Sequence, residues 1–463
     1  MPLKVSSACP ECGAPTNHNE GALTFPCQYC ASVLRMPDDG TPLKYIIPAR
    51  LDTAQAAKAV KKALVEGKIG DVATIKKITA VYKPFWHIKG MLFFLAAGTG
   101  KTNITAKTWF HSFPANDGFV PSFASLGIQS EVLALEHYDT EKIPETAVVL
   151  PITIEKEAAL EAAGKTARGV MNGEGGAFAF SDLKIIGGKL FTIYYPVLAV
   201  TCRGKTGSRT VMLDGINGNP LGEEEGDAIP TPPAPVGTAI HAPKLLTHRC
   251  PNCGHNLKTG DFDLTFHCRE CRSLWLLKNN DYIRIKINAI RPPETGECAF
   301  IPFWRFTLEI YGGEGTAAIK KIGELAKIMT GGGFSLRAED PEREIAFYVP
   351  ALVSRNASGI LNFAVRINIF QKQFPLYAHE EMPEGEVFGA SLPEDEAREM
   401  LEPLVFAITG RIDRKMMEFY RAIRITVKKS ELVLYPVRYE KDSVVDAYHD
   451  FHFAKRWLDT NVY

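Results

Sequence analysis

Residues 9–13 read Cys-Pro-Glu-Cys-Gly and residues 27–30 read Cys-Gln-Tyr-Cys, and these two cysteine pairs decide the fold of the first part of the chain. Two residues between paired cysteines let one tight turn present both sulfurs to a single ion, and four thiolates complete the tetrahedral shell that Zn²⁺ prefers. A glycine after the second cysteine allows the left-handed backbone that directs N–H groups toward sulfur. The spacing therefore predicts a zinc ribbon.

The same spacing returns in the second half of the chain. Residues 250–254 read Cys-Pro-Asn-Cys-Gly and residues 268–271 read Cys-Arg-Glu-Cys, each cysteine 241 positions after its counterpart. A redox role for the pairs and iron in place of zinc are the alternatives. Four thiolates leave no open position for a water molecule, so we expect two structural Zn²⁺ ions per chain. The predicted ligands are Cys9, Cys12, Cys27, Cys30, Cys250, Cys253, Cys268 and Cys271.

Further landmarks recur at nearly the same distance. Tyr-Pro-Val at 195–197 returns at 435–437, a shift of 240 residues. Pro-Phe-Trp at 84–86 returns at 302–304, a shift of 218 residues, which indicates a loss between ribbon and body in the second half. Because several landmarks keep their order, we interpret the chain as an internal duplication.

The segment between the two copies is rich in glutamate and proline and lacks apolar patterning, which is typical of an extended linker. The predicted fold class is α+β, with two zinc ribbons that are each followed by a body of antiparallel β-sheet with packed helices. The predicted units are ribbon 1 at 1–37, body 1 at 38–221, the linker at 222–247, ribbon 2 at 248–278 and body 2 at 279–463.

Local patterns predict individual elements within the bodies. Asp52 is a suitable N-cap for a helix over 54–65, where Ala, Val and Leu alternate with Lys at helical spacing. Strands are predicted by β-branched and aromatic runs, and the turn-rich segment 203–207 suggests a hairpin. The expected strands are 86–95, 191–202, 208–213, 283–287 and 363–370, and a further helix is expected over 393–407.

Composition excludes several classes of protein. The 463 residues carry 53 basic and 53 acidic side chains, so there is no overall excess of positive charge for nucleic acid. The longest apolar run, 91–97, is far shorter than the roughly 18 residues of a membrane span. The first residues lack the apolar run of a secretory signal, and Cys-x-x-Cys pairs in a large unsecreted chain indicate metal. We therefore expect a cytoplasmic protein that could reach a membrane only through a partner.

Several other features are better explained by a structural role than by catalysis or ligand binding. Residues 98–102 resemble the end of a phosphate-binding loop, but Leu95 stands where the pattern needs glycine and a strand-like segment follows. Cys202 and Cys298 stand outside the Cys-x-x-Cys pairs, Cys202 is expected to be a buried inert thiol, and His449 with His452 is a weaker metal candidate. No arrangement of a nucleophile with a base is apparent, so we expect no enzyme.

The segment 44–89 carries ten Lys or Arg and three acidic residues, a local charge of +7. It is either a solvated helix face or a docking surface for nucleic acid, an acidic partner or an anionic lipid surface.

The paired knuckles resemble zinc ribbons of the transcription-factor-IIB type. The wider pattern is similar to a bacterial family of zinc-ribbon-containing proteins, in which the ribbon precedes a Tyr-x-x-Pro stretch, a Lys-rich helix, a Tyr-x-Pro-Phe-Trp strand and a Tyr-Pro strand with an Asp-Gly turn. Here these motifs lie at 45–48, 54–66, 82–86, 195–196 and 214–215. Some relatives in that family resemble factors of membrane stress.

These observations lead to a function hypothesis. The favoured one is a non-catalytic zinc-binding scaffold or adaptor that mediates contacts between proteins. The alternative is a nucleic-acid-associated factor that uses the ribbons and the Lys-rich region 44–89.

Overall fold

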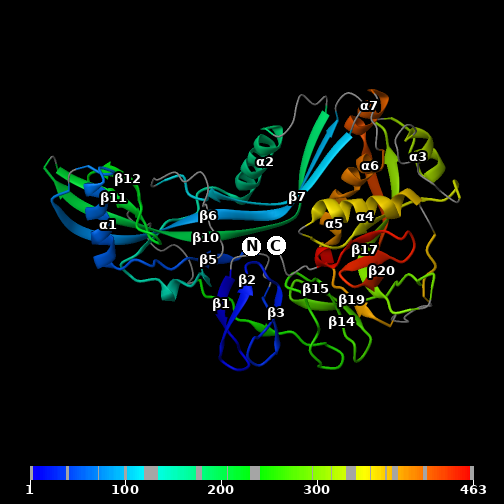
Figure 1. Cartoon of the computed structure of the whole chain (residues 1–463), viewed down its shortest axis with the longest axis horizontal. Coiled ribbons are helices and arrows are strands. Elements are labelled where there is room, and N and C mark those ends of the chain that lie inside the picture. Colours follow the sequence, from blue (N-terminus) through cyan, green and yellow to red (C-terminus); the bar gives the residue numbers. More distant parts are fainter. Residues whose placement is uncertain are drawn as a thin grey trace.

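A computed structural model describes the chain with several internal gaps (Figure 1). The described residues are 4–37, 41–70, 72–97, 102–118, 134–173, 180–205, 207–229, 240–294, 296–313, 315–329, 340–354, 356–370, 373–377, 384–409 and 414–458.

A ten-stranded sheet forms the first half of the molecule. Along its main path the order is β12-β11-β10-β5-β8-β1-β2, while β6 lies on the other side of β10 and pairs with β7 and β9. Its strands are β1 (Lys4–Ala8), β2 (Pro15–Asn19), β5 (Lys44–Ile46), β6 (Thr74–Ala97), β7 (Thr102–Pro114), β8 (Ala134–His137), β9 (Val148–Val149), β10 (Phe180–Gly204), β11 (Gly207–Asp214) and β12 (Pro220–Glu225).

Strands β6 and β10 form a long antiparallel ladder that spans most of the molecule (Figure 1). Residues 81–96 of β6 are almost all buried, because both faces of the strand are covered. Ile88 and Phe94 pack under α2 (Lys156–Gly173), and Met91 and Phe93 pack into the second half. A strand that is covered on both faces reads as a continuous apolar run, which is how this segment appears in the sequence.

Helix α1 (Thr53–Val65) lies at the outer end of this ladder (Figure 1). Its predicted N-cap is confirmed, since Asp52 Oδ1 accepts from Gln55 N at 2.7 Å and Gln55 Oε1 accepts from Asp52 N at 2.9 Å. This capping box satisfies two backbone donors that the helix itself leaves unpaired. Val60 and its buried neighbours pack onto β10 and β11.

The second half contains a six-stranded sheet of order β18-β17-β20-β21-β22, with β19 beside β17. Its strands are β17 (Ala299–Tyr311), β18 (Ile345–Pro350), β19 (Glu386–Val387), β20 (Arg424–Glu440), β21 (Ser443–Asp446) and β22 (His452–Ala454). The helices around it are α3 (Ile322–Ile328), α4 (Ala357–Phe370), α5 (Glu394–Glu399), α6 (Leu401–Thr409) and α7 (Arg414–Ala422). Short 3₁₀ helices are η1 (Thr140–Lys142) and η2 (Lys455–Leu458).

One predicted strand is wrong. Residues 363–370 belong to helix α4, in which ten residues are buried. Phe363 and Ala364 face different cores, so the helix is apolar nearly all round and its sequence shows no single stripe. Such a run cannot be distinguished from a strand by periodicity alone. The helix predicted over 393–407 is present as α5 and α6, which meet at Met400.

The two bodies repeat the same contacts. Pro84 lies opposite Tyr194 in β6·β10, and Pro302 lies opposite Leu434 in β17·β20, so the register differs by the same 218 and 240 residues as the sequence landmarks. The indole Nε1 of Trp86 donates to the Ile154 carbonyl at 2.7 Å.

The matching indole in the second body makes the matching bond. Nε1 of Trp304 donates to the carbonyl of Leu392 at 2.9 Å. In each body the acceptor lies two residues before a helix, α2 in the first and α5 in the second. Tyr195 and Tyr435 likewise each donate a hydroxyl hydrogen bond to an aspartate, at 2.9 and 2.6 Å.

The halves share a core. Met91, Phe93 and Leu95 of β6 lie in one hydrophobic cluster with residues of β17, α4 and α6. The hydroxyl of Ser358 in α4 donates to the Ala106 carbonyl of β7 at 2.6 Å. The two halves are therefore packed against each other over an apolar surface as well as joined by the chain.

The segment predicted as a linker over 222–247 contains two pieces of regular structure. Its first residues belong to β12, which pairs with β11. Its last two form β13 (Leu246–Thr247). The proline-rich middle, 230–239, lies outside the described residues. Across the described part of the chain, no helix is both long and apolar enough to cross a membrane.

Candidate metal centres

The first cysteine tetrad lies on two turns that follow short strands. Cys9 and Cys12 follow β1, and Cys27 and Cys30 follow β3 (Thr24–Pro26). The Sγ–Sγ distances are 3.8 Å for Cys9–Cys30 and 3.8 Å for Cys12–Cys27, and all four sulfurs lie within 4.8 Å of one another. Zn–S bonds of about 2.3 Å place the corners of a tetrahedron about 3.8 Å apart. The predicted ligands are therefore brought together at the spacing that zinc requires.

The second tetrad repeats this geometry. Its Sγ–Sγ distances are 3.6 Å for Cys250–Cys271 and 3.5 Å for Cys253–Cys268, and its four sulfurs also lie within 4.8 Å. All eight predicted ligands thus fall into two groups that fit a metal ion. Closed shells of four thiolates suit structural zinc and offer no position for a substrate.

The turns that carry the ligands have the expected backbone. Gly13 N donates to Cys9 O at 2.8 Å, and Gly254 N donates to Cys250 O at 2.9 Å. Both glycines have positive φ, 73° and 77°. The second turn of each ribbon uses Ala31 (φ 60°) or Arg272 (φ 56°) in the same place. The positive φ of the first turn could be predicted from its glycine, whereas the positive φ of Ala31 and Arg272 could not be predicted from the sequence.

Each tetrad also has a serine that the sequence reasoning missed. Ser273 Oγ lies 2.9 Å from Cys271 Sγ and accepts from Trp275 Nε1 at 2.7 Å, so its own proton is available to the sulfur. Ser32 stands at the matching position of ribbon 1, and its hydroxyl lowers the pKa of Cys30 to about 6. A lowered pKa favours the thiolate that binds metal. The signal was present as a serine two residues after the last cysteine of each tetrad.

The histidines near the ribbons belong to other contacts. His18 is buried, and its Nε2 lies 3.3 Å from Nε2 of His137 in β8. Neither cysteine tetrad includes His18, His255 or His267. His449 lies 2.9 Å from Asp446 and stacks on Phe370. Among the described residues, His449 and His452 belong to no group of three metal-ligating side chains.

A third group of ligand-type atoms joins the linker to body 1. Asp139, Glu141 and His241 lie within 4.8 Å of one another, with His241 Nδ1 at 3.9 Å from Asp139 and 3.8 Å from Glu141. The Glu141 and His241 side chains are exposed. This is an electrostatic contact on the surface, and we assign no ion to it.

The two ribbons lie side by side (Figure 1). Leu23 N donates to the Asp261 carbonyl at 2.6 Å, and Thr24 Oγ1 donates to the Gly260 carbonyl at 2.9 Å. Strand β13, which leads into ribbon 2, pairs with β4 (Val33–Arg35) and completes the small sheet of ribbon 1. Ribbon 2 has its own three strands, β14 (Thr265–His267), β15 (Leu274–Lys278) and β16 (Asp281–Ile285).

Body 1 meets both ribbons at Lys89. Its ammonium lies 3.1 Å from the Glu20 carboxylate, and both side chains are 4% exposed. The same ammonium lies 4.9 Å above the ring of Phe262 in ribbon 2. Burial lowers the pKa of Lys89, and the Glu20 carboxylate opposes that shift. The ion pair therefore fixes ribbon 1 to body 1 beside ribbon 2.

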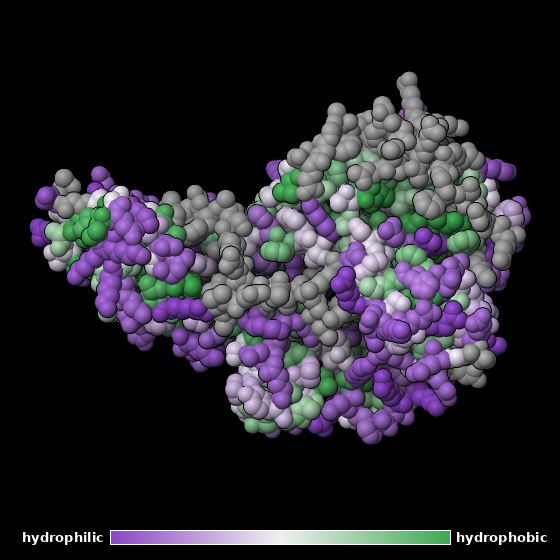
Figure 2. Space-filling view, in the orientation of Figure 1, coloured by the Kyte–Doolittle hydropathy of each residue, from purple (hydrophilic) through white to green (hydrophobic). Residues whose placement is uncertain are grey.

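The Lys-rich segment 44–89 is split between surface and interior. Lys83 and Lys89 are buried. Six other lysines are exposed at or near the outer end of the arm that carries α1, where Figure 2 shows hydrophilic surface beside hydrophobic patches. Two of them are close to Glu66, Lys62 at 3.8 Å and Lys68 at 2.8 Å. The exposed lysines are Lys58, Lys61, Lys62, Lys68, Lys76 and Lys77.

The remaining predicted features have structural places. Residues 98–101 of the loop-like motif lie outside the described residues, but β7 follows them and pairs with β6, where a phosphate-binding loop needs a helix. Cys202 and Cys298 are buried, and burial raises the pKa of both thiols. A raised pKa leaves these cysteines unreactive.

Comparison of the chain with protein-family models, with curated proteins and with solved structures finds no match. The two cysteine tetrads therefore carry the functional argument.

Proposed function

We propose that the chain is a non-catalytic, cytoplasmic zinc-binding adaptor that presents surfaces to protein partners. The observation that carries this proposal is the pair of cysteine tetrads whose sulfur spacings, 3.5–3.8 Å, fit tetrahedral zinc. Closed tetrads contribute folding free energy and no reactive position. The metal would hold the ribbons in shape at the junction of the two bodies.

The proposal extends to the origin of the molecule. We propose that two ribbon–body units arose by duplication, and that the ribbons are of the transcription-factor-IIB type found in the bacterial family that the sequence resembles. The equal registers of Pro84 and Pro302 support a duplication, as do the matching indole bonds of Trp86 and Trp304. A duplicated scaffold offers two related but different surfaces to partners.

Metal analysis tests the zinc assignment. The purified chain should contain two zinc ions, and Cys253→Ser should lower this number to about one because a ribbon with three ligands binds metal weakly. Absence of zinc, or the red absorption of iron, would contradict the assignment. Loss of both ions from the single change would contradict separate sites.

Partner capture tests the adaptor role. The zinc-loaded chain, tagged and immobilised, should retain specific proteins from a native lysate, and a Cys12→Ser/Cys253→Ser variant should lose those that contact the ribbons. Recovery of no protein by the wild-type chain would count against an adaptor.

The exposed lysines at the end of the arm favour one alternative, a nucleic-acid-associated factor. Binding to phosphate backbones releases counterions and weakens steeply with salt. Reversal of charge at Lys58, Lys61 and Lys62 should then reduce affinity for DNA or RNA, measured by filter binding at two salt concentrations. If the wild-type chain binds neither nucleic acid at low salt, this alternative is excluded.

A further inference from the structure

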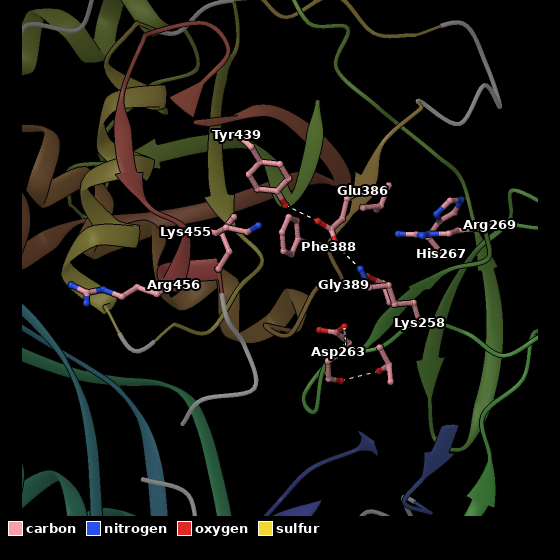
Figure 3. Close-up of a pocket in the computed structure, with 15 residues that line it drawn as sticks. Lys258, Asp263, His267, Arg269, Glu386, Phe388, Gly389, Tyr439, Lys455 and Arg456 are labelled. Carbon is pink, nitrogen blue, oxygen red and sulfur yellow. Dashed lines mark hydrogen bonds and ion pairs between the residues drawn. The ribbon is translucent and has the colours of Figure 1, made fainter. Parts of the chain in front are cut away.

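A cleft separates ribbon 2 from body 2 (Figure 3). It consists of a cavity of about 420 Å³ and a neighbouring one of about 510 Å³. Four residues line both cavities, so the two form one continuous cleft. These are His267, Arg269, Glu386 and Tyr439.

Two short strands border this cleft. Strand β14 contributes Thr265 and His267 to the lining, and β19 contributes Glu386 and Val387. Among the described strands, β14 pairs only with β15 and β19 only with β17, so each is an edge strand. A space between two strand edges fits an extended peptide better than a compact ligand.

The walls meet at one end of the cleft. Leu264 N donates to the Ala390 carbonyl at 2.6 Å, and Ala390 N donates to Thr265 Oγ1 at 2.7 Å. Asp263 is buried there against Gly389. Residue 389 has no room for a side chain, because a Cβ would lie 2.3 Å from the carboxyl carbon of Asp263. The cleft is thus closed at this end by packed backbone.

Cationic side chains come to the cleft from both walls. Lys258 is paired with Glu386, and the Lys455 ammonium lies 4.3 Å above the ring of Tyr439. Three arginines on the lining make no hydrogen bond or ion pair with any other described residue. These are Arg269, Arg272 and Arg456.

Acidic residues occupy defined parts of the same cleft. Asp263 is at the closed end, and Glu386 is held by Lys258 and by the Tyr439 hydroxyl at 2.6 Å. Glu297 and Glu384 line only the second cavity, as does Arg272, while Arg269 and Arg456 line the first. The first cavity therefore offers unneutralised positive charge next to the aromatic ring of Phe388.

Ribbon 1 has a cysteine tetrad of similar geometry without these charges. At the positions 241 residues earlier it has Asn17, Gln28 and Ala31 in place of Lys258, Arg269 and Arg272. Ala31 and Arg272 have nearly the same positive φ, so the backbone is alike. A tetrad of this geometry thus forms in ribbon 1 without the cations of ribbon 2.

We propose that this cleft is where the adaptor binds a partner, through an extended acidic peptide segment of that partner. The proposal rests on the adaptor function proposed above. Carboxylates of the segment pair with Arg269, Arg272 and Arg456, and its alternate apolar side chains contact Phe388 and the Tyr439 ring. Each arginine presents a planar fork of N–H donors that matches a carboxylate.

A direct binding measurement tests the cleft. The probe is a fluorescein-labelled octapeptide of alternating Glu and Val, and the readout is anisotropy with the full zinc-loaded chain. Arg269→Gln/Arg272→Ala, which installs the residues of ribbon 1, should weaken binding by about tenfold or more, since hydrogen bonds between two charged groups are lost. Lys455→Ala/Arg456→Ala, which lies away from the cysteine turns, should also weaken it severalfold.

Controls separate the cleft from general charge attraction. Lys61→Ala/Lys62→Ala on α1 removes two cations elsewhere and should leave the affinity unchanged. An octapeptide of alternating Lys and Val should not bind. Each variant must keep two zinc ions, which shows that its ribbons are folded.

The proposal is overturned if the acidic peptide does not bind, if both cleft variants bind it as tightly as the wild type does, or if the Lys–Val peptide binds equally well. Displacement of the peptide by millimolar free glutamate would also overturn it, because the cleft would then be a small-anion site. Lysate capture distinguishes the two proposals. If both cleft variants capture the same partners as the wild type, the cleft fails and the adaptor function stands. If the wild type captures none, the adaptor function fails.

Discussion

At the residue scale, two kinds of side chain decide how the ribbons behave, the hydroxyls beside the sulfurs and the buried histidines beside the first ribbon. Ser273 sits between Trp275 and Cys271, accepting from one and available to donate to the other. Such second contacts orient metal ligands and tune their affinity. His18 and His137 are held neutral by burial, which lowers the pKa of His18 to about 4 and that of His137 to about 3.

Ser273→Ala should weaken zinc binding by ribbon 2 by about tenfold, because it removes a hydrogen bond to the Cys271 thiolate and leaves a buried indole N–H without its acceptor. Competition with a chromophoric chelator measures the change, and ribbon 1 is the internal reference because its zinc should be released as before. Ser208→Ala, which removes an exposed hydroxyl bonded to Asp227, is the control. Equal release of both ions from the variant would contradict a role for this hydroxyl.

The buried histidines predict loss of stability in acid. A histidine with a folded pKa of about 3 and an unfolded pKa of about 6.5 is protonated first in the unfolded chain. The stability it permits is therefore complete above pH 6.5 and falls as pH decreases below that value. Between pH 7 and pH 5.5 the wild type should lose about 1 kcal/mol more than His137→Gln, measured by urea unfolding.

Zinc loss in acid affects both proteins alike. The informative result is therefore the difference between the two proteins in how the free energy of unfolding changes with pH. Parallel pH profiles for wild type and His137→Gln would mean that His137 is not held neutral in the folded state.

At the element scale, the sequence predicts whether a segment forms a helix or a strand better than it predicts which other elements pack against that segment. The capped helix α1 and the antiparallel β10·β11 pair follow from local signals, and both are present. Strand β6 was recognised only in part, and its odd-numbered apolar face packs into the other half, a contact that no local pattern encodes. Residues 363–370 of helix α4 were predicted as a strand, because a helix that is buried on all sides has no single apolar stripe in its sequence.

The candidate site divides in the same way. All eight cysteines were predicted, since the ligands of each group lie in two Cys-x-x-Cys pairs that can be recognised in the sequence. The cleft between ribbon 2 and body 2 was not, because residues such as Arg269, Glu386 and Lys455 come from three distant segments.

A buried ion pair is one of the contacts that hold ribbon 1 against body 1. Glu20→Gln should destabilise the protein by about 3 kcal/mol, because the buried Lys89 ammonium loses the carboxylate that lies 3.1 Å from it. Adding Lys89→Met should recover much of that loss, since the unpaired ammonium is then removed from the interior. Urea unfolding of the two single variants and the double variant measures the coupling. Additive losses in the double variant would show that the pair does not act as a unit.

At the scale of the whole molecule, the halves share several matching contacts and also pack against each other. Strand β13 completes the sheet of ribbon 1 from the start of the second half. The edge of ribbon 1 at Leu23 bonds to Asp261 in ribbon 2, while the matching edge at Leu264 bonds to Ala390 in body 2. Each ribbon thus uses the same edge for a different neighbour, and the two units interlock.

This interlocking changes what cleavage between the halves should do. If residues 222–247 were a plain linker between independent units, the cut chain would release two folded halves. The structure joins them through the β13–β4 pairing and through the core shared by β6, β17 and α4. A protease site introduced within residues 230–239 should therefore give two fragments that still elute together in size-exclusion chromatography, with both zinc ions retained. The two fragments should separate only in denaturant, because their separation in native buffer would expose the apolar surface between them to water. Met91→Glu in the shared core should loosen the cut protein more than the uncut one, since only the uncut chain keeps the halves at high effective concentration. Two fragments that elute separately in native buffer would mean that the contacts between the halves are too weak to hold them, and that each ribbon–body unit stands alone.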